Sequence, residues 1–456
     1  MKKLTRYILS VLTLWFCFST TVFAFQGTTI PENVKNSVRE RVDGGYNTGI
    51  VVVYITENAV DYYCYGEKKI GQKDPVDKNS IFEIGSISKV FTSIILSDMV
   101  LKGELNLEDP IEKYLPDDVK VPKRKNNNIT LLNLAIHNSG LPRMPNNFKP
   151  EDPQNPYADY TVKNMYDFVS GHKLRRDIGG QYEYSNLGMG FLGHLLSLVN
   201  GKEYENVLKE RICSKIGMEN TFIKFNENNS RELASGHSGG KVVSNWDIPT
   251  LAGAGAIRSN AVDMVKFIRA NLGIENTEIS NAVDFSHGKR FKVSDNLELG
   301  LAWHISVNEN SRIIWHNGGT GGYRAFCGFN KKKKTGAVVL CNSNVSCDDI
   351  GFYLLDRSRK LKETKKEVTV AESILEKYVG IYEIVPSFKL TVTRDKTRLF
   401  VQATGQSKGE IFAKSETEFF AKAVEATFIF ETDKNEVVTG LVLRQSGRDQ
   451  KAKKIK

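Results

Sequence analysis

The sequence predicts a mixed α/β domain of the α+β kind, built on an antiparallel sheet and followed by a small antiparallel β-barrel. An apolar run at 49–55 and a second strand-like run at 59–65 are typical of a hairpin in a largely buried antiparallel sheet. An amphipathic run that begins at Ser86 predicts a helix. From Leu375 onward, short alternating segments separated by polar turns predict a small antiparallel barrel, with a sandwich as the alternative.

The first 24 residues have the pattern of a secretory signal peptide. Lys2, Lys3 and Arg6 precede an apolar stretch at 7–23, and Val22-Phe23-Ala24 resembles a signal-peptidase site. We therefore expect export to the periplasm or the medium, and no membrane span after cleavage. The predicted organisation is a signal peptide at 1–24, a catalytic domain at 25–356, a charged linker at 357–370 and a barrel domain at 371–456.

Ser86 and Lys89 stand at the start of the first predicted helix. The spacing of three places both side chains on one helix face, one turn apart. A serine hydroxyl becomes a nucleophile when a neighbouring base takes its proton, and a desolvated lysine can lose its charge and do so. The N-terminus of the helix would stabilise negative charge that develops on a substrate carbonyl. The alternative is an N-cap serine followed by a solvated lysine.

Tyr184-Ser-Asn186 precedes a second apolar helix at 187–199. A tyrosine close to a lysine can relay a proton, and an asparagine amide can both donate to and accept from a substrate amide. Tyr182 is out of register with this motif, and we interpret it as structural. We also expect a structural role for His137, which lies where the helix at 129–138 ends in a turn.

Strands are predicted at the end of the first domain, where a strand ends in His316-Asn-Gly318-Gly319 and further strands cover 323–329 and 336–342. Another serine, Ser238, lies in a Gly-x-Ser-x-Gly pattern. That nucleophile elbow requires an apolar strand before it and a helix after it, whereas 226–232 is polar and a proline follows at 249. We therefore do not expect Ser238 to be the nucleophile. In the barrel domain, strands are predicted at 378–382, 388–392, 399–403, 418–421, 427–430 and 438–443.

The composition argues against several other functions. The formal charge is +10, and removal of the three signal-peptide cations leaves 10 − 3 = +7. The excess occurs in short runs without interleaved aromatic residues, including 451–456, which we interpret as solvated loops and a tail. Nucleic acid is therefore not an expected partner. No Cys or His pair has zinc-ligand spacing, so we expect no metal and no cofactor. Of the six cysteines, Cys341 and Cys347 are near enough for a disulfide, with buried thiols as the favoured alternative.

Phe82-Glu-Ile-Gly-Ser-Ile-Ser-Lys89 closely resembles the active-site stretch of class C β-lactamases and their relatives, the D-alanyl-D-alanine carboxypeptidases, D-aminopeptidases and some esterases. Tyr184-Ser-Asn186 and His316-Asn-Gly318 match two further motifs of that family in the same order, so the resemblance covers residues 30 to 355. It implies an α/β/α sandwich with an antiparallel sheet and helices on both faces. The C-terminal part resembles the lipocalin-like domain attached to some of these hydrolases.

The resemblance also implies roles. Ser86 attacks a carbonyl, Lys89 and Tyr184 transfer protons, and Asn186 positions the substrate. The backbone amides of Ser86 and Gly319, beside Gly318, would hold the oxyanion. His316 replaces the lysine that pairs with the substrate carboxylate in β-lactamases, and we expect it to bind that carboxylate more tightly as pH falls.

The substrate itself stays open. A small molecule or peptide is expected: a β-lactam, a D-peptide-like amide or an ester. A penicillin-binding sensor or scaffold that is acylated without turnover is the remaining alternative. The sequence makes no prediction of oligomeric state.

Overall fold

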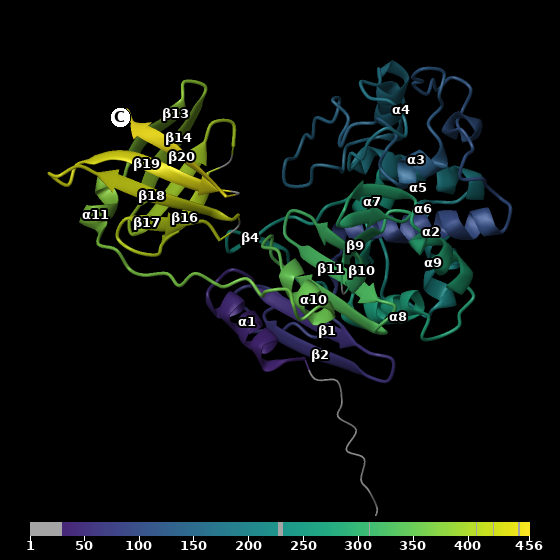
Figure 1. The fold of residues 1–456 in the computed structure, drawn as a ribbon, viewed down its shortest axis with the longest axis horizontal. Coiled ribbons are helices and arrows are strands. Elements are labelled where there is room, and N and C mark those ends of the chain that lie inside the picture. The colour runs from purple at the N-terminus through teal and green to yellow at the C-terminus, as the bar shows by residue number, and fades with distance from the viewer. Residues whose placement is uncertain (1–29, 227–230, 310, 407, 423, 446) are drawn as a thin grey trace, which may run out of the picture.

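A computed structural model describes residues 30–226, 231–309, 311–406, 408–422, 424–445 and 447–456. The predicted signal peptide lies outside these ranges. An eight-stranded antiparallel sheet organises the first domain (Figure 1). Its order is β2-β1-β12-β11-β10-β9-β8-β7, with the bounds β1 Gly49–Ile55, β2 Val60–Gly66, β7 Phe291–Ser294, β8 Leu297–Leu299, β9 His304–Asn308, β10 Ser311–Gly319, β11 Arg324–Asn330 and β12 Thr335–Cys341. This confirms the expected α+β fold with an antiparallel sheet.

Both faces of this sheet are covered by helices, which explains why β1 is apolar throughout. Val51 and Val53 pack into one core cluster, with α2 (Ser88–Leu101), α8 (Ala261–Leu272) and α9 (Ser280–His287). Ile50 and Val52 point to the other face and pack with α1 (Glu32–Asp43) and α10 (Asp348–Leu355). Because successive side chains of a strand alternate between faces, a strand buried on both sides has no polar positions.

The remaining elements of the first domain connect and extend these layers. The helices are α3 Leu131–Ala135, α4 Val162–Gly171, α5 Asn186–Asn200, α6 Tyr204–Arg211 and α7 Ala252–Gly255. The short strands are β3 Phe82–Glu83, which pairs with β6 Arg258–Ser259, and β4 His237–Ser238, which pairs with β5 Lys241–Val242. In Figure 1, α3, α4, α5 and α6 gather beyond α2, on the side away from α1.

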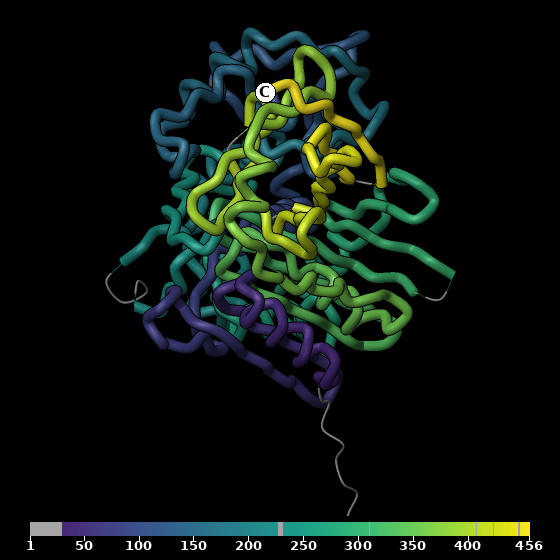
Figure 2. Tube along the Cα trace, turned by 90° about the vertical axis from the view of Figure 1, so that its left-hand side faces the viewer, coloured from purple at the N-terminus to yellow at the C-terminus, as the bar shows by residue number. Residues whose placement is uncertain are grey.

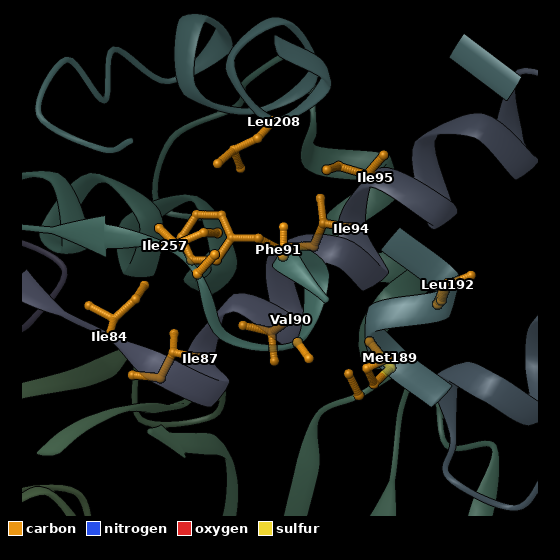
Figure 3. Packing of buried hydrophobic residues seen from close by; sticks show 14 of the residues in the cluster. Ile84, Ile87, Val90, Phe91, Ile94, Ile95, Met189, Leu192, Leu208 and Ile257 are labelled. Carbon is orange, nitrogen blue, oxygen red and sulfur yellow. The ribbon is translucent and has the colours of Figure 1, made fainter. Parts of the chain in front are cut away.

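Helix α2 is buried on all sides from Ser88 to Met99, whereas the sequence suggested one apolar face. Phe91 stacks on Phe267 with ring centroids 4.0 Å apart, and other α2 side chains pack around Met189 and Ile257 (Figure 3). Polar α2 side chains bond to backbone carbonyls, as Thr92 Oγ1 does to Gly253 O at 2.8 Å. The helix is therefore fixed within the core, and so are the residues at its N-terminus.

The second domain is a closed eight-stranded antiparallel barrel, as predicted. After α11 (Glu372–Lys377), its strands are β13 Gly380–Val385, β14 Phe388–Asp395, β15 Arg398–Ala403, β16 Gly409–Ala413, β17 Glu418–Phe420, β18 Ala426–Thr432, β19 Val438–Gln445 and β20 Arg448–Lys454. The interpretation of 451–456 as a solvated tail is wrong for most of that run, because β20 pairs with both β19 and β13 and closes the barrel.

The barrel lies beside the sheet domain and separate from it. It is at the left in Figure 1 and in front in Figure 2, which is viewed from that side. Tyr46 anchors the connecting segment: its hydroxyl donates to Lys365 O at 2.9 Å, and its ring stacks on Phe420 of β17 with centroids 6.3 Å apart. Lys422 lies over the same ring.

The cysteines and helices of the described ranges bear on two further expectations. Five cysteines, Cys64, Cys213, Cys327, Cys341 and Cys347, are present there as free thiols, so the Cys341–Cys347 disulfide is not formed. Four of them are buried, as the alternative predicted. No helix within these ranges is long and apolar enough to cross a membrane.

Candidate active site

The chain turns sharply between β3 and α2, and this turn presents Ser86. Gly85 has φ +49°, a left-handed conformation that favours glycine. A β-carbon built on Gly85 would lie 2.6 Å from the Gly319 amide nitrogen, so the turn and the end of β10 are in close backbone contact. Ser86 itself is half-buried.

Lys89 lies one helical turn below Ser86 and is fully buried. Its Nζ is 3.0 Å from Ser86 Oγ and donates to Ala254 O at 2.6 Å. Burial lowers the pKa of Lys89 well below its usual range, and the positive charge of Arg143 acts in the same direction. Burial thus favours the neutral amine, which with one hydrogen donated to Ala254 O could turn its lone pair to the Ser86 hydroxyl.

Tyr184 covers this pair from the other side. Lys89 Nζ lies 4.9 Å from the centroid of the Tyr184 ring. Burial raises the pKa of Tyr184, with a smaller opposing effect from a hydrogen bond with Ser86, so the side chain is a protonated phenol at neutral pH. The arrangement thus places an amine whose pKa is lowered and a protonated phenol close to one hydroxyl.

His137 holds the Tyr184 segment in place. Its Nδ1 accepts the backbone N–H of Ser185 at 3.1 Å, and its carbonyl accepts the N–H of Glu183 at 2.7 Å. Its ring packs on Tyr184 with centroids 4.6 Å apart. These contacts agree with the structural role expected for His137.

Asn186 is the first residue of α5. Ser185 caps this helix, because its Oγ accepts the N–H of Gly188 at 2.8 Å. The Asn186 backbone N–H donates to Arg143 O at 3.0 Å, and its side-chain Nδ2 lies 3.8 Å from Met144 Sδ. The Asn186 side chain is half-buried beside the turn that follows α3.

Strand β10 brings His316, Gly318 and Gly319 to the Ser86 turn. A β-carbon built on Gly318 would lie 1.9 Å from Ile84 O and 3.1 Å from Ser86 N. Gly318 therefore allows β10 to run directly against the turn, so that the backbone of Gly319 and the backbone at Gly85 and Ser86 lie close together.

His316 differs from the expectation of a partly charged imidazole. It is fully buried, and burial lowers its pKa well below its ordinary value, with the charges of His304 and Lys89 acting in the same direction. Its Nδ1 lies 2.6 Å from the Asn317 carbonyl oxygen, and within the described residues its Nε2 has no hydrogen-bond partner. The neighbouring His304 also has a pKa lowered by burial, to about 4. His316 is thus neutral near pH 7, because a charged imidazole in this enclosure would be poorly solvated.

Ser238 and Tyr182, which were not expected to act in catalysis, have other partners. Ser238 is in the short hairpin β4–β5, where no helix follows, and its hydroxyl accepts from Asn344 Nδ2 at 2.8 Å. Tyr182 pairs with His304 Nε2 at 3.2 Å. A cavity of about 1080 Å³ opens between the barrel mouth and residues 237–241, and none of the predicted site residues lines it.

The comparison with known families agrees with this geometry. The family model named Beta-lactamase matches residues 34–355. The chain belongs to the beta-lactamase family. As a member, it is a hydrolase of the serine β-lactamase type. A second model, a domain of unknown function (DUF3471), matches residues 364–454, which contain the barrel.

Similar proteins of this family include both peptidases and beta-lactamases. The chain is 29% identical over 341 residues to the D-alanyl-D-alanine-carboxypeptidase/endopeptidase AmpH of Escherichia coli K12, which covers 70% of this chain and 87% of the relative. It is 27% identical to a beta-lactamase of Pseudomonas fluorescens over 70% and 94% of the two chains. A crystal structure of a beta-lactamase/D-alanine carboxypeptidase from Yersinia pestis superposes with a TM-score of 0.62 at 25% identity, covering 68% and 92%.

Three contributors to the site were missed by reasoning from the sequence. The carbonyl of Ala254 comes from α7, in a short segment rich in glycine and alanine. His304 lies on β9, and nothing in its local sequence marks it. Arg143 follows the Leu141-Pro142 turn. The position of this cation directly after the turn was the one local signal that could have identified Arg143.

Proposed function

We propose that this protein is a serine hydrolase that cleaves an amide, β-lactam or D-peptide-like, through an acyl-enzyme on Ser86. The observation that carries this proposal is the contact of the half-buried Ser86 with the fully buried Lys89, with Oγ and Nζ 3.0 Å apart. Burial without a carboxylate partner favours the neutral form of a lysine, and a neutral amine at that distance would be a general base for the hydroxyl.

In the acylation step, Ser86 Oγ attacks the substrate carbonyl carbon while its proton passes to Lys89 Nζ. The charge that develops on the carbonyl oxygen is stabilised by the amides of Ser86 and Gly319. Tyr184, held as a phenol, donates its proton to the leaving nitrogen and regains one from Lys89. The C–N bond breaks, and the acyl group remains on Ser86.

In the deacylation step, a water molecule attacks the ester carbonyl and returns a proton to Ser86 through the same two groups. Asn186 and His316 flank the site and would orient the acyl group. The neutral His316 would do so by hydrogen bonding through Nε2, and not as a cation. The residues would need no metal or cofactor for any of these steps.

Adduct mapping tests the nucleophile directly. After reaction with a fluorophosphonate or a penicillin, mass spectrometry should place the added mass on the peptide that contains Ser86. Ser86→Ala should remove it, and Ser238→Ala should leave it. An adduct that persists in Ser86→Ala and disappears in Ser238→Ala would overturn the proposal.

A substrate panel tests the class of bond. It should contain nitrocefin, D-Ala-D-Ala peptides, D-aminoacyl amides and short esters. Steady turnover of an amide supports the proposed reaction, whereas turnover of esters alone would make the protein an esterase. A single burst of acylation with penicillin and no later turnover would instead indicate a penicillin-binding sensor. Export of the chain remains a prediction, to be checked by sequencing the mature N-terminus.

A further inference from the structure

The site contains three imidazoles, and none of them supplies a positive charge. His137, His304 and His316 surround Tyr184, with ring centroids 4.6, 6.5 and 6.3 Å from its own. All three are buried. Lys89 is neutral as well, if it is to act as the base. A substrate carboxylate would therefore find no cation among the residues that the sequence motifs identify.

Arg143 supplies a cation from outside those motifs. Its guanidinium carbon lies 5.1 Å from the centroid of the Tyr184 ring, the same ring that Lys89 Nζ approaches to 4.9 Å. The Arg143 backbone is fixed to the site, since its carbonyl accepts the N–H groups of Asn186 at 3.0 Å and Leu187 at 3.2 Å. The guanidinium thus lies beside the Tyr184 ring, on a backbone that is tied to the start of α5.

No acidic residue competes for this guanidinium in the parts of the chain that the structure describes. Arg143 is exposed and forms no ion pair there. The nearest acid in sequence to Tyr184, Glu183, is paired with Arg176. The positive charge of Arg143 nevertheless acts on Lys89, because after burial it is the second cause that lowers the pKa of Lys89. A planar guanidinium that forms no ion pair among the described residues and lies beside the Tyr184 ring is suited to hold a carboxylate through two hydrogen bonds.

We propose that Arg143 is the residue that selects anionic substrates, by docking a carboxylate located close to the scissile bond. This inference rests on the proposed function and narrows it: amides or esters that carry such a carboxylate should be preferred over neutral ones. It also transfers to Arg143 the recognition that the sequence motif assigned to His316.

A matched pair of substrates tests this directly. The two would be aryl esters that differ in one group only: one has a free carboxylate next to the reacting acyl carbon, and the other has a carboxamide in its place. Arg143→Met keeps much of the side-chain bulk over Tyr184 and removes the charge. We expect its KM for the carboxylate substrate to rise about tenfold relative to any change for the carboxamide, as for a partly exposed charge pair. Arg143→Lys should restore part of the difference.

Salt and control variants separate docking from a general effect of charge. In the wild-type protein, KM for the carboxylate substrate should rise with ionic strength, and Arg143→Met should remove that dependence. Arg175→Met is the matched control, because Arg175 is also an exposed arginine and makes no described contact with Tyr184. Equal losses on both substrates, or the same selectivity change in Arg175→Met, would overturn the assignment of Arg143.

Failure of the underlying reaction can be recognised separately. Labelling of Ser86 by a neutral fluorophosphonate reports the nucleophile without involving a carboxylate. Absence of this label from the folded wild-type protein would overturn the proposed function and the Arg143 inference with it. Normal labelling of Ser86, combined with an equal KM for the carboxylate and the carboxamide substrates, would overturn the Arg143 inference alone.

Discussion

Gly318 lies so close to Ile84 that a β-carbon on Gly318 would come within 1.9 Å of the Ile84 carbonyl oxygen. The clash would involve backbone on both sides, so it cannot be relieved by the rotation of a side chain. Under the proposed mechanism this contact couples the fold to hydrolytic activity, since it brings the backbone of Gly319 close to the Ser86 turn.

We expect Gly318→Ala to push β10 away from the turn. The free energy of unfolding should fall by about 1–3 kcal/mol, and the acylation rate by about 10²–10³-fold if one oxyanion donor is lost. Denaturant unfolding and fluorophosphonate labelling would measure the two effects. Gly171→Ala is the control, since nothing lies within 4 Å of a β-carbon there and its φ is not positive. Full activity in Gly318→Ala would contradict the role of this contact.

The acylation rate should be nearly independent of pH on the alkaline side. An ordinary lysine, with a pKa near 10.4, would deliver more base as pH rises through about 8 to 10. Burial lowers the pKa of Lys89 well below that value, so we expect its base form to be complete before the alkaline range and to be lost only as pH falls through the lowered pKa. The pH profile of labelling by a neutral fluorophosphonate checks this. A steady rise up to about pH 10 would mean that Lys89 keeps an ordinary pKa.

Lys89 and Tyr184 should act as one proton-transfer unit. Because Lys89 Nζ lies 4.9 Å from the centroid of the Tyr184 ring, Lys89 can return a proton to Tyr184 after Tyr184 has donated its own. Lys89→Met and Tyr184→Phe should each lower acylation greatly, and the double variant should lose little more, because groups that act together are not additive. Single-turnover acylation rates of the four proteins give the comparison. Fully additive losses would show that the two groups act independently.

His304 should make the fold less stable in acid. Its pKa is about 4 in the folded protein, below the unfolded value of about 6.5, so the unfolded chain binds the extra proton first. Its contribution is present above about pH 6.5 and is lost as pH falls to about 4, by up to about 3 kcal/mol. His304→Phe should therefore show a smaller loss of unfolding free energy between pH 7 and 4.5 than the wild-type protein. An equal loss in both would contradict this explanation.

The sequence predicted the sheet and the main motifs because their signals are local. The unbroken apolar run in β1 marks a strand that is buried on both faces, and the spacing of Ser86 and Lys89 follows from one helical turn. The barrel was predicted from alternation, but β16 and β20 were missed. In β20 only Ala452 is buried among charged neighbours. A strand whose outer face is entirely charged resembles a solvated tail until its partners are known.

The charges of the site could not be predicted from the sequence, because they depend on enclosure by distant segments. Near neutral pH a histidine in water is partly charged, yet His316 is neutral because it is buried beside His304 of β9 and Tyr184. Burial lowers the pKa of Lys89 in the same way. The position of Arg143 over Tyr184 depends on hydrogen bonds between a turn and the start of α5, about forty residues later. Sequence spacing carries no information on such contacts.

The pairing of β1 with β12 has a consequence for the kinetics of folding. Ile50 is opposite Cys341 and Val52 is opposite Val339, so β1 reaches this neighbour only after nearly 300 further residues have been synthesised. Contacts so distant in sequence form slowly, because the entropy of closing a long loop is lost before the contacts contribute any stability. Until then an apolar strand is unprotected on one edge, and nascent chains should depend on chaperones to avoid aggregation. If the chain is exported, the same delay would keep it unfolded long enough to be threaded across a membrane.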